Sequence, residues 1–320
     1  MCFVYVVQHG AVLGINGGNL TIRFPDGTSR SVPKGLVEGI SVFSNAVLTK
    51  QCIDYCLSSD VKVGFFASNG TYRGSLSPVK NTNTYRLRRQ ISLFDDETFC
   101  LNLAKRIVNA KIRNQTVVLR RYSYGRKDEC SDYIHQMNRI AKDKIWRARS
   151  VNQIIGYEGY ASRMYFKWIS SVIKEGFAFE SRNRRPSRDP FNSMLNYGYA
   201  ILSKEMHGEL ENRSLNPYIG FMHKDKYGHT ALVSDMIEEW RPVIVDSVVL
   251  SLIQGHEIGC SDFELDSGGC RMNTDAIKTL LSKLEQKMET KTGYLKYFDS
   301  PISFREAIWH QADMILKITE

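Results

Sequence analysis

The chain has 320 residues, of which 42% are hydrophobic and 24% charged, so its composition excludes a disordered chain and a membrane-embedded protein. Its net charge of +9 is unevenly spread: residues 80–190 hold 24 Lys and Arg against 11 Asp and Glu, which leaves the rest of the chain at about −4. A concentrated positive charge favours a polyanionic partner such as nucleic acid, with a solvated basic surface as the alternative.

The most apolar stretches, such as residues 248–253, are too short to cross a bilayer, so we expect no membrane association. The N-terminus opens on a strand-like run without the basic start and cleavage site of a signal peptide. Seven scattered cysteines are typical of reduced thiols. We therefore expect a cytoplasmic protein.

Residues 1–76 carry the signals of a β-rich domain. Residues 3–7 and 39–43 are predicted to be strands, and Asn16-Gly17-Gly18 separates two strand-like arms in a hairpin pattern. Asn69-Gly70 marks a second hairpin, between residues 61–66 and 71–76. A short helix is expected over residues 49–58.

Residues 77–90 are polar and are interpreted as a linker, and the 3–4 period of amphipathic helices dominates residues 91–320. We expect helices over residues 91–114, 131–149, 152–173, 190–212, 230–255, 273–290 and 302–318. The fold class is therefore α+β, with a small N-terminal β-rich domain followed by a larger all-α catalytic domain.

Glu158 is the first candidate for chemistry. It lies on the apolar stripe of the helix over residues 152–173, four residues after Ile154 and three before Ala161. An inward carboxylate is costly unless it is paired, hydrogen-bonded or bound to a metal ion. Because no Lys or Arg lies three or four residues away, its partner has to come from elsewhere in the fold, and a satisfied buried carboxylate is the plain alternative.

A second candidate region covers residues 220–242. His223 opens a polar loop, and the helix that follows carries Asp235 and Glu238 three residues apart, on one face. Glu239 is also near, and Pro242 should interrupt the helix. One imidazole and several carboxylates suit a hard divalent cation, Mg²⁺ or Mn²⁺, better than Zn²⁺. A solvated acidic face and a structural histidine are the alternatives.

At these residues the chain resembles the CRISPR-associated protein one family, the metal-dependent DNA integrases and endonucleases of CRISPR adaptation. The resemblance covers essentially the whole chain. "IIGYEGYASRMYF" is similar to the first catalytic motif, whose acid corresponds to Glu158. "PYIGFMHKDKYGHTALVSDMIEEWRPVIVD" is similar to the second, whose metal-binding histidine corresponds to His223 and whose acid corresponds to Glu238. Asp235 matches an acidic position that some members place near the metal ion.

The resemblance implies a function. Members join the 3′-hydroxyl ends of short prespacer DNA to the repeat of a CRISPR array by transesterification, with catalytic residues expected here at Glu158, His223 and Glu238. Members form homodimers through the β-rich domain, and two dimers usually flank a dimer of the small CRISPR-associated protein two. The expected metal ligands are the same three residues and Asp235, holding Mg²⁺ or Mn²⁺.

Basic residues between the two motifs and at the domain junction are expected to bind DNA phosphates without reading sequence. These are Arg182, Arg184, Arg185, Arg188, Lys224, Arg86, Arg88 and Arg89. Two alternatives stay open: a structure-specific, metal-dependent nuclease that hydrolyses branched DNA, and a non-catalytic DNA-binding scaffold.

Overall fold

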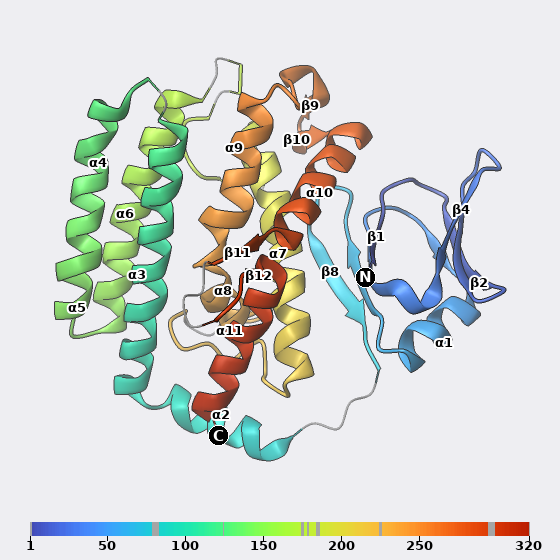
Figure 1. Ribbon diagram of the computed structural model, residues 1–320, viewed down its shortest axis with the longest axis horizontal. Helices are drawn as coiled ribbons and strands as arrows, with labels where there is room; N and C mark the ends of the chain where they lie inside the picture. Colours follow the sequence, from blue (N-terminus) through green and yellow to red (C-terminus); the bar gives the residue numbers. More distant parts are fainter. Residues whose placement is uncertain are drawn as a thin grey trace.

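The computed structural model describes residues 2–78, 83–123, 125–173, 176–177, 179–183, 186–223, 226–293 and 298–319. A β-rich N-terminal part precedes a larger helical part, and Figure 1 shows the two side by side, with α7 and α10 next to the sheets and α3, α4 and α6 farthest from them. The expected fold class is thus confirmed. Within the described ranges, no helix combines the length and the apolar character needed to cross a membrane.

The N-terminal part contains two four-stranded sheets. One has the order β1-β5-β7-β8, with β1, β5 and β7 parallel and β8 antiparallel to β7. The other has the order β4-β3-β2-β6, and it contains the predicted hairpin between β2 and β3. The strands are β1 (Cys2–Val6), β2 (Val12–Asn16), β3 (Asn19–Arg23), β4 (Ser29–Pro33), β5 (Val37–Val42), β6 (Val47–Leu48), β7 (Lys62–Phe66) and β8 (Tyr72–Leu76), with α1 (Lys50–Ser58) after β6.

Between these sheets lies an apolar core of their own, which includes Leu13, Leu20, Ile40 and Val63. A second core runs through the helices and reaches the first sheet through Phe43 and Phe66. The Phe43 ring stacks on the Phe66 ring at 4.4 Å and on Tyr197 of α7 at 5.0 Å, measured between ring centroids. Burial of these rings fixes the β-rich part against the helices.

The helical part is built around three long helices. Its helices are α2 (Thr84–Phe94), α3 (Glu97–Tyr122), α4 (Lys127–Arg139), α5 (Ile145–Arg147), α6 (Val151–Val172), α7 (Pro190–Asn212), α8 (Ala231–Ile237), α9 (Ser247–Gln254), α10 (Thr274–Glu289) and α11 (Phe304–Thr319). It also contains two short strand pairs that the sequence did not predict: β9 (Phe263–Asp266) with β10 (Gly269–Met272), and β11 (Lys291–Thr292) with β12 (Ile302–Ser303).

Three predicted helices differ from the structure. The helix expected over residues 91–114 is two helices, because α2 ends at Phe94 and Asp96 caps α3 by accepting the Phe99 N–H at 2.9 Å. Helix α2 begins at Thr84, inside the range interpreted as linker, of which residues 79–82 lie outside the described part. The helices expected over residues 131–149 and 230–255 are both interrupted, by π-helical turns at Ile140–Lys144 and at Arg241–Asp246, the latter containing the predicted break at Pro242.

Candidate active site

Glu158 lies in the middle of α6, which starts where the Ser150 hydroxyl caps the Gln153 N–H. The predicted apolar stripe is confirmed, since Ile154 and Ala161 are fully buried. The Glu158 side chain itself is 23% exposed, and its Oε1 accepts a hydrogen bond from the Ser162 hydroxyl at 2.8 Å. The carboxylate therefore sits at the edge of the helical core.

The cation that the α6 sequence lacks comes from α3. The ammonium of Lys111, a residue only 7% exposed, contacts Glu158 Oε1 and Glu238 Oε2 at the same time. Two carboxylates from different helices thus meet on one nitrogen. Burial alone would lower the pKa of Lys111, but attraction by Glu238 and Glu158 raises it above its usual value, so the ammonium stays charged.

Glu238 lies directly after α8 and is 4% exposed. Its Oε1 forms an ion pair with Arg241 Nη1 at 3.1 Å, and the Lys111 ammonium contacts its other oxygen, Oε2. Burial would raise the pKa of this carboxyl, but Arg241 and Lys111 outweigh that cost and lower it to about 2. Glu238 is therefore an anion at any physiological pH.

His223 ends the segment before the polar loop, and Asp235 holds it there. Asp235 is fully buried and accepts from the His223 ring at Nδ1 (2.6 Å) and from the His223 backbone N–H (3.0 Å). Its second oxygen accepts the backbone N–H groups of Phe221 (2.6 Å) and Met222 (2.9 Å). These four donors give Asp235 a positioning role towards His223, and its role as a metal ligand stays a prediction.

Glu158 and Glu238 meet through Lys111, whereas the ring of His223 contacts Asp235. In the part of the chain that the structure describes, no three His, Cys, Asp or Glu side chains are arranged to hold a metal ion. The reason is local: Asp235 fixes the imidazole by Nδ1, while Lys111 occupies the position between the carboxylates. Glu158, Glu238 and His223 still fit a hard divalent cation. Both carboxylates already contact one positive charge, the Lys111 ammonium, and Nε2 lies on the side of the ring opposite Asp235.

A cavity of about 500 Å³ opens beside the two carboxylates, and Glu158 forms part of its lining. Its cationic walls come from four elements of the fold. The basic residues that line it are Lys111, Arg163, Lys167, Arg182 and Arg241. A second cavity of about 830 Å³ shares the wall made by Arg182, Tyr199 and Arg241. The two spaces adjoin, and a negatively charged chain would meet cations in both.

Asp246, at the end of the Arg241–Asp246 turn, also lines the smaller cavity. It is 1% exposed and accepts hydrogen bonds from the hydroxyls of Tyr165 (2.9 Å) and Tyr199 (2.5 Å). Burial raises the pKa of this carboxyl to about 6, although both tyrosines oppose the shift. The Tyr199 ring in turn lies under the guanidinium groups of Arg182 (5.3 Å) and Arg241 (4.9 Å).

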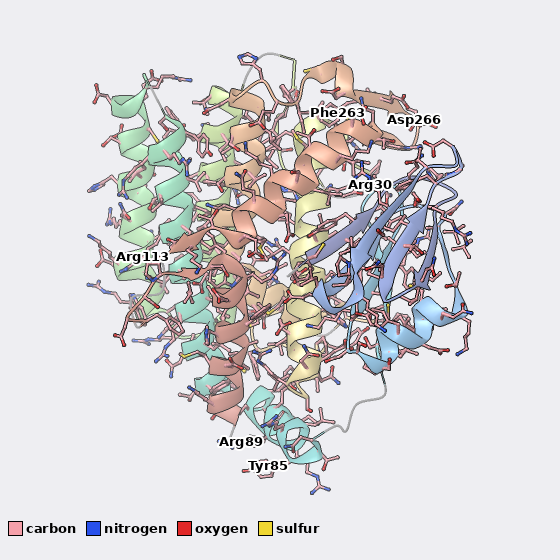
Figure 2. The ribbon with its side chains drawn as sticks, turned by 45° about the vertical axis from the view of Figure 1, so that its right-hand side comes forward. Arg30, Tyr85, Arg89, Arg113, Phe263 and Asp266 are labelled. Carbon is pink, nitrogen blue, oxygen red and sulfur yellow. The ribbon has the colours of Figure 1, made fainter. Side chains whose placement is uncertain are left out.

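The predicted DNA-binding residues fall in different places. Arg182 lines both cavities, but it also donates to Asn196 Oδ1 at 2.8 Å and to Asn192. Arg188 is exposed, with its backbone N–H held by Asn183. Arg88 and Arg89 are exposed on α2, which packs against α3 and α11 at the lower end of the molecule in Figure 2, and Arg86 donates to the Arg213 carbonyl at 3.4 Å. Arg184, Arg185 and Lys224 lie outside the described residues.

Sequence reasoning missed Lys111, Arg241, Asp246 and Gln90. Lys111 follows Ile107 by four residues and Val108 by three, so the inward-charge criterion that identified Glu158 would have found it too. Gln90 is fully buried inside the range interpreted as linker, and its amide bonds the carbonyls of Asn216 and Ile219 at 2.9 Å each. It thereby anchors the segment that leads to His223.

The comparisons with known proteins point to one family. Residues 4–286 match the family described as CRISPR associated protein Cas1. A CRISPR-associated endonuclease Cas1 from Mycobacterium tuberculosis is 30% identical over 100% of this chain and 94% of its own length. Another from Thermus thermophilus is 31% identical over 98% of this chain and 92% of its own.

Solved structures share the fold. The Cas1 protein of Thermotoga maritima superposes with a TM-score of 0.81 at 22% identity, over 99% of this chain and 97% of that one. A casposase bound to integration product gives 0.85 at 22% identity, over 100% and 90%. A Cas6-RT-Cas1–Cas2 complex gives 0.83 at 21% identity, over 99% of this chain and 35% of that one. With the family match across most of its length and relatives at 30% identity, the chain belongs to the CRISPR-associated protein Cas1 family.

Proposed function

We propose that this chain is a metal-dependent DNA integrase and endonuclease of CRISPR adaptation, which joins prespacer 3′-hydroxyl ends to a CRISPR repeat by transesterification. The observation that carries the proposal is the meeting of Glu158 and Glu238 on one cation, beside a cavity lined by arginines and lysines. The relatives named CRISPR-associated endonuclease Cas1 support nuclease chemistry, and the casposase bound to integration product supports strand joining on this fold.

The metal ion is proposed to be Mg²⁺ or Mn²⁺, held by Glu158, Glu238 and Nε2 of His223. Carboxylates favour both ions, and the imidazole adds a preference for Mn²⁺. When bound, such an ion supplies Lewis-acid polarisation of a phosphodiester oxygen and neutralises its growing negative charge.

The residues of the chain prepare this chemistry. Asp235 contacts Nδ1 of His223, which leaves Nε2 as the ring nitrogen available to the proposed ion. Arg241 keeps Glu238 ionised and oriented. In-line displacement at phosphorus needs no covalent protein intermediate, so positioning of the two DNA strands is the main task left to the protein.

The cationic cavity walls are proposed to bind the DNA backbone. Arg163, Lys167 and Arg182 surround the space next to Glu158 and would hold phosphates by charge, independently of sequence. Binding should therefore weaken steeply as salt rises. Arg184, Arg185, Lys224 and the arginines of α2 remain proposed contacts.

The proposed partners are prespacer DNA, repeat DNA and a second copy of this chain. A dimer of the small CRISPR-associated protein two is proposed as a further partner, supported by the Cas6-RT-Cas1–Cas2 complex, whose Cas1-containing chain has the same fold. A cytoplasmic location, where such DNA is found, stays part of the proposal.

Hydrolysis is the second candidate, because the relatives are named endonucleases and the same site can use water in place of a 3′-hydroxyl. Incubation with prespacer duplexes, a supercoiled repeat-containing plasmid and Mn²⁺, with and without the small partner, separates the two. Covalently joined product supports the integrase. Nicked plasmid without joining, even with the partner present, supports a hydrolytic nuclease, and retarded but uncut DNA supports a binding scaffold.

A further inference from the structure

Lys111 occupies the position that a metal ion shared by Glu158 and Glu238 would need. Its ammonium contacts one oxygen of each carboxylate, and the side chain is 9% exposed. Two cations cannot share these oxygens at contact distance, because unscreened repulsion between them in a partly buried site is large. Loading of the site therefore requires the ammonium to move.

Gln115 provides a place for it to go. It lies one helical turn after Lys111 on α3, so the two side chains share a face, and both line the 500 Å³ cavity. Gln115 is 1% exposed, and its Oε1 is a buried acceptor with no hydrogen-bond partner among the described residues. Its amide nitrogen contacts the Ser162 hydroxyl at 3.3 Å, so the Oε1 atom is the part of this amide left without a partner.

A buried acceptor without a donor is costly, so a donor that reached Gln115 Oε1 in another state would be stabilised there. An ammonium is the strongest donor nearby. Asp246 adds a favourable field, since it lines the same cavity and lies close enough for Lys111 to stabilise its ionised form. The cavity thus has both room and acceptors for a displaced lysine.

We infer that Lys111 is an internal counter-cation: it holds Glu158 and Glu238 together until a divalent ion displaces it, and Gln115 Oε1 then receives its ammonium. The inference rests on the proposed metal-dependent function and adds a positioning residue to it. Lys111 keeps the carboxylate pair assembled in the metal-free protein, and its displacement lowers the affinity for the ion.

The test measures Mn²⁺ binding to the full chain by titration calorimetry, with thermal unfolding of the same samples. Lys111→Met removes the ammonium and keeps most of the side-chain length. The metal-free variant should unfold at a lower temperature than the parent protein, because the two carboxylates then lose the cation between them and keep only the ion pair of Glu238 with Arg241. Its Mn²⁺ dissociation constant should fall about tenfold, the effect of removing one competing charge from a partly buried site. Lys105→Met, an equal loss of charge on the same helix, should leave the affinity unchanged.

Gln115→Met tests whether Gln115 Oε1 receives the displaced ammonium, with Lys111 in place. It also keeps the inference testable if Lys111→Met fails to fold. It should weaken Mn²⁺ binding several-fold while changing metal-free stability little, since Oε1 has no partner in that state. Mn²⁺ binding that is unchanged or weaker in Lys111→Met, or unchanged in Gln115→Met, overturns the inference while the proposed function stands. A parent protein that binds no Mn²⁺ overturns the proposed metal site, and the inference with it.

Discussion

Asp235 holds both ends of His223: its carboxylate accepts from the imidazole at Nδ1 at 2.6 Å and from the backbone N–H of the same residue at 3.0 Å. Because the other oxygen accepts the N–H groups of Phe221 and Met222, the whole turn before the loop depends on one buried anion. The orientation of His223 is thus built into the core.

Asp235→Asn should destabilise the protein and weaken the proposed metal site together. Each carboxylate oxygen serves two donors, so an amide nitrogen at either position would face N–H groups and leave them unpaired. We expect a loss of about 2–4 kcal/mol in the free energy of unfolding. Urea unfolding measures it, with the exposed Asp132→Asn as control. An Asp235→Asn variant as stable as the parent would contradict the role given to this residue.

The β-rich part was largely predictable, because its signals are local. Asn16-Gly17-Gly18 and Asn69-Gly70 set hairpins through backbone preferences that neighbouring residues decide. The helix breaks were not predicted, although Asp95, Asp96 and Glu97 interrupt the apolar pattern where α3 begins. The π-helical turn at Ile140–Lys144 has no sequence signature.

The residues of the site also differ in how far the sequence predicts them. Glu158 was found from its helical register, and His223 and Glu238 mainly from family resemblance. The pairing partner of Glu158 lies 47 residues away, on another helix, so no spacing rule connects them. Asp235 was predicted as a ligand from its helical spacing to Glu238 and from the family resemblance. Its four donors come from another segment and could not be read from either.

Asp246 should make stability depend on pH. Its pKa of about 6 in the folded protein lies above the usual 3.8, so its contribution is fully present below pH 3.8 and is lost as pH rises through 6. Asp246→Asn removes this dependence. The stability of the parent protein relative to the variant should fall by up to about 3 kcal/mol between pH 4 and pH 7. Urea unfolding of both proteins across this range measures the change, and a difference independent of pH would contradict it.

Glu238 should have the opposite dependence. Its folded pKa of about 2 lies below the usual 4.5, so its contribution is present above pH 4.5 and is lost as pH falls towards 2. In metal-free protein at neutral pH, Glu238→Gln should cost more stability than Glu158→Gln. Glu238 pairs with two cations at 5% side-chain exposure, whereas Glu158 pairs with one at 23%. Chemical denaturation ranks the variants, and the reverse order would refute this account.

Arg182 and Arg188 should separate structure from DNA binding. Arg188→Ala removes an exposed charge and should weaken DNA binding with little change in melting temperature, and it should lower the slope of log K against log salt by about 1. Arg182→Ala should lower both the DNA affinity and the melting temperature, because Asn192 and Asn196 lose the guanidinium that donates hydrogen bonds to them. Salt-dependent binding isotherms and melting curves measure both effects. Equal melting temperatures for the two variants would argue against a structural role of Arg182.

Glu158 and Glu238 are proposed to form the metal site of a strand-transfer enzyme. A strand-transfer assay on labelled branched DNA with Mn²⁺ tests this, following both joined and released strands for the parent protein, Glu158→Gln and Glu238→Gln, with DNA affinity recorded for each. Both variants should lose strand transfer by at least about a hundredfold while DNA binding stays within a few-fold, and a chelator should abolish the parent activity. Strand transfer that persists in Glu158→Gln, or in the parent protein with chelator present, would contradict it.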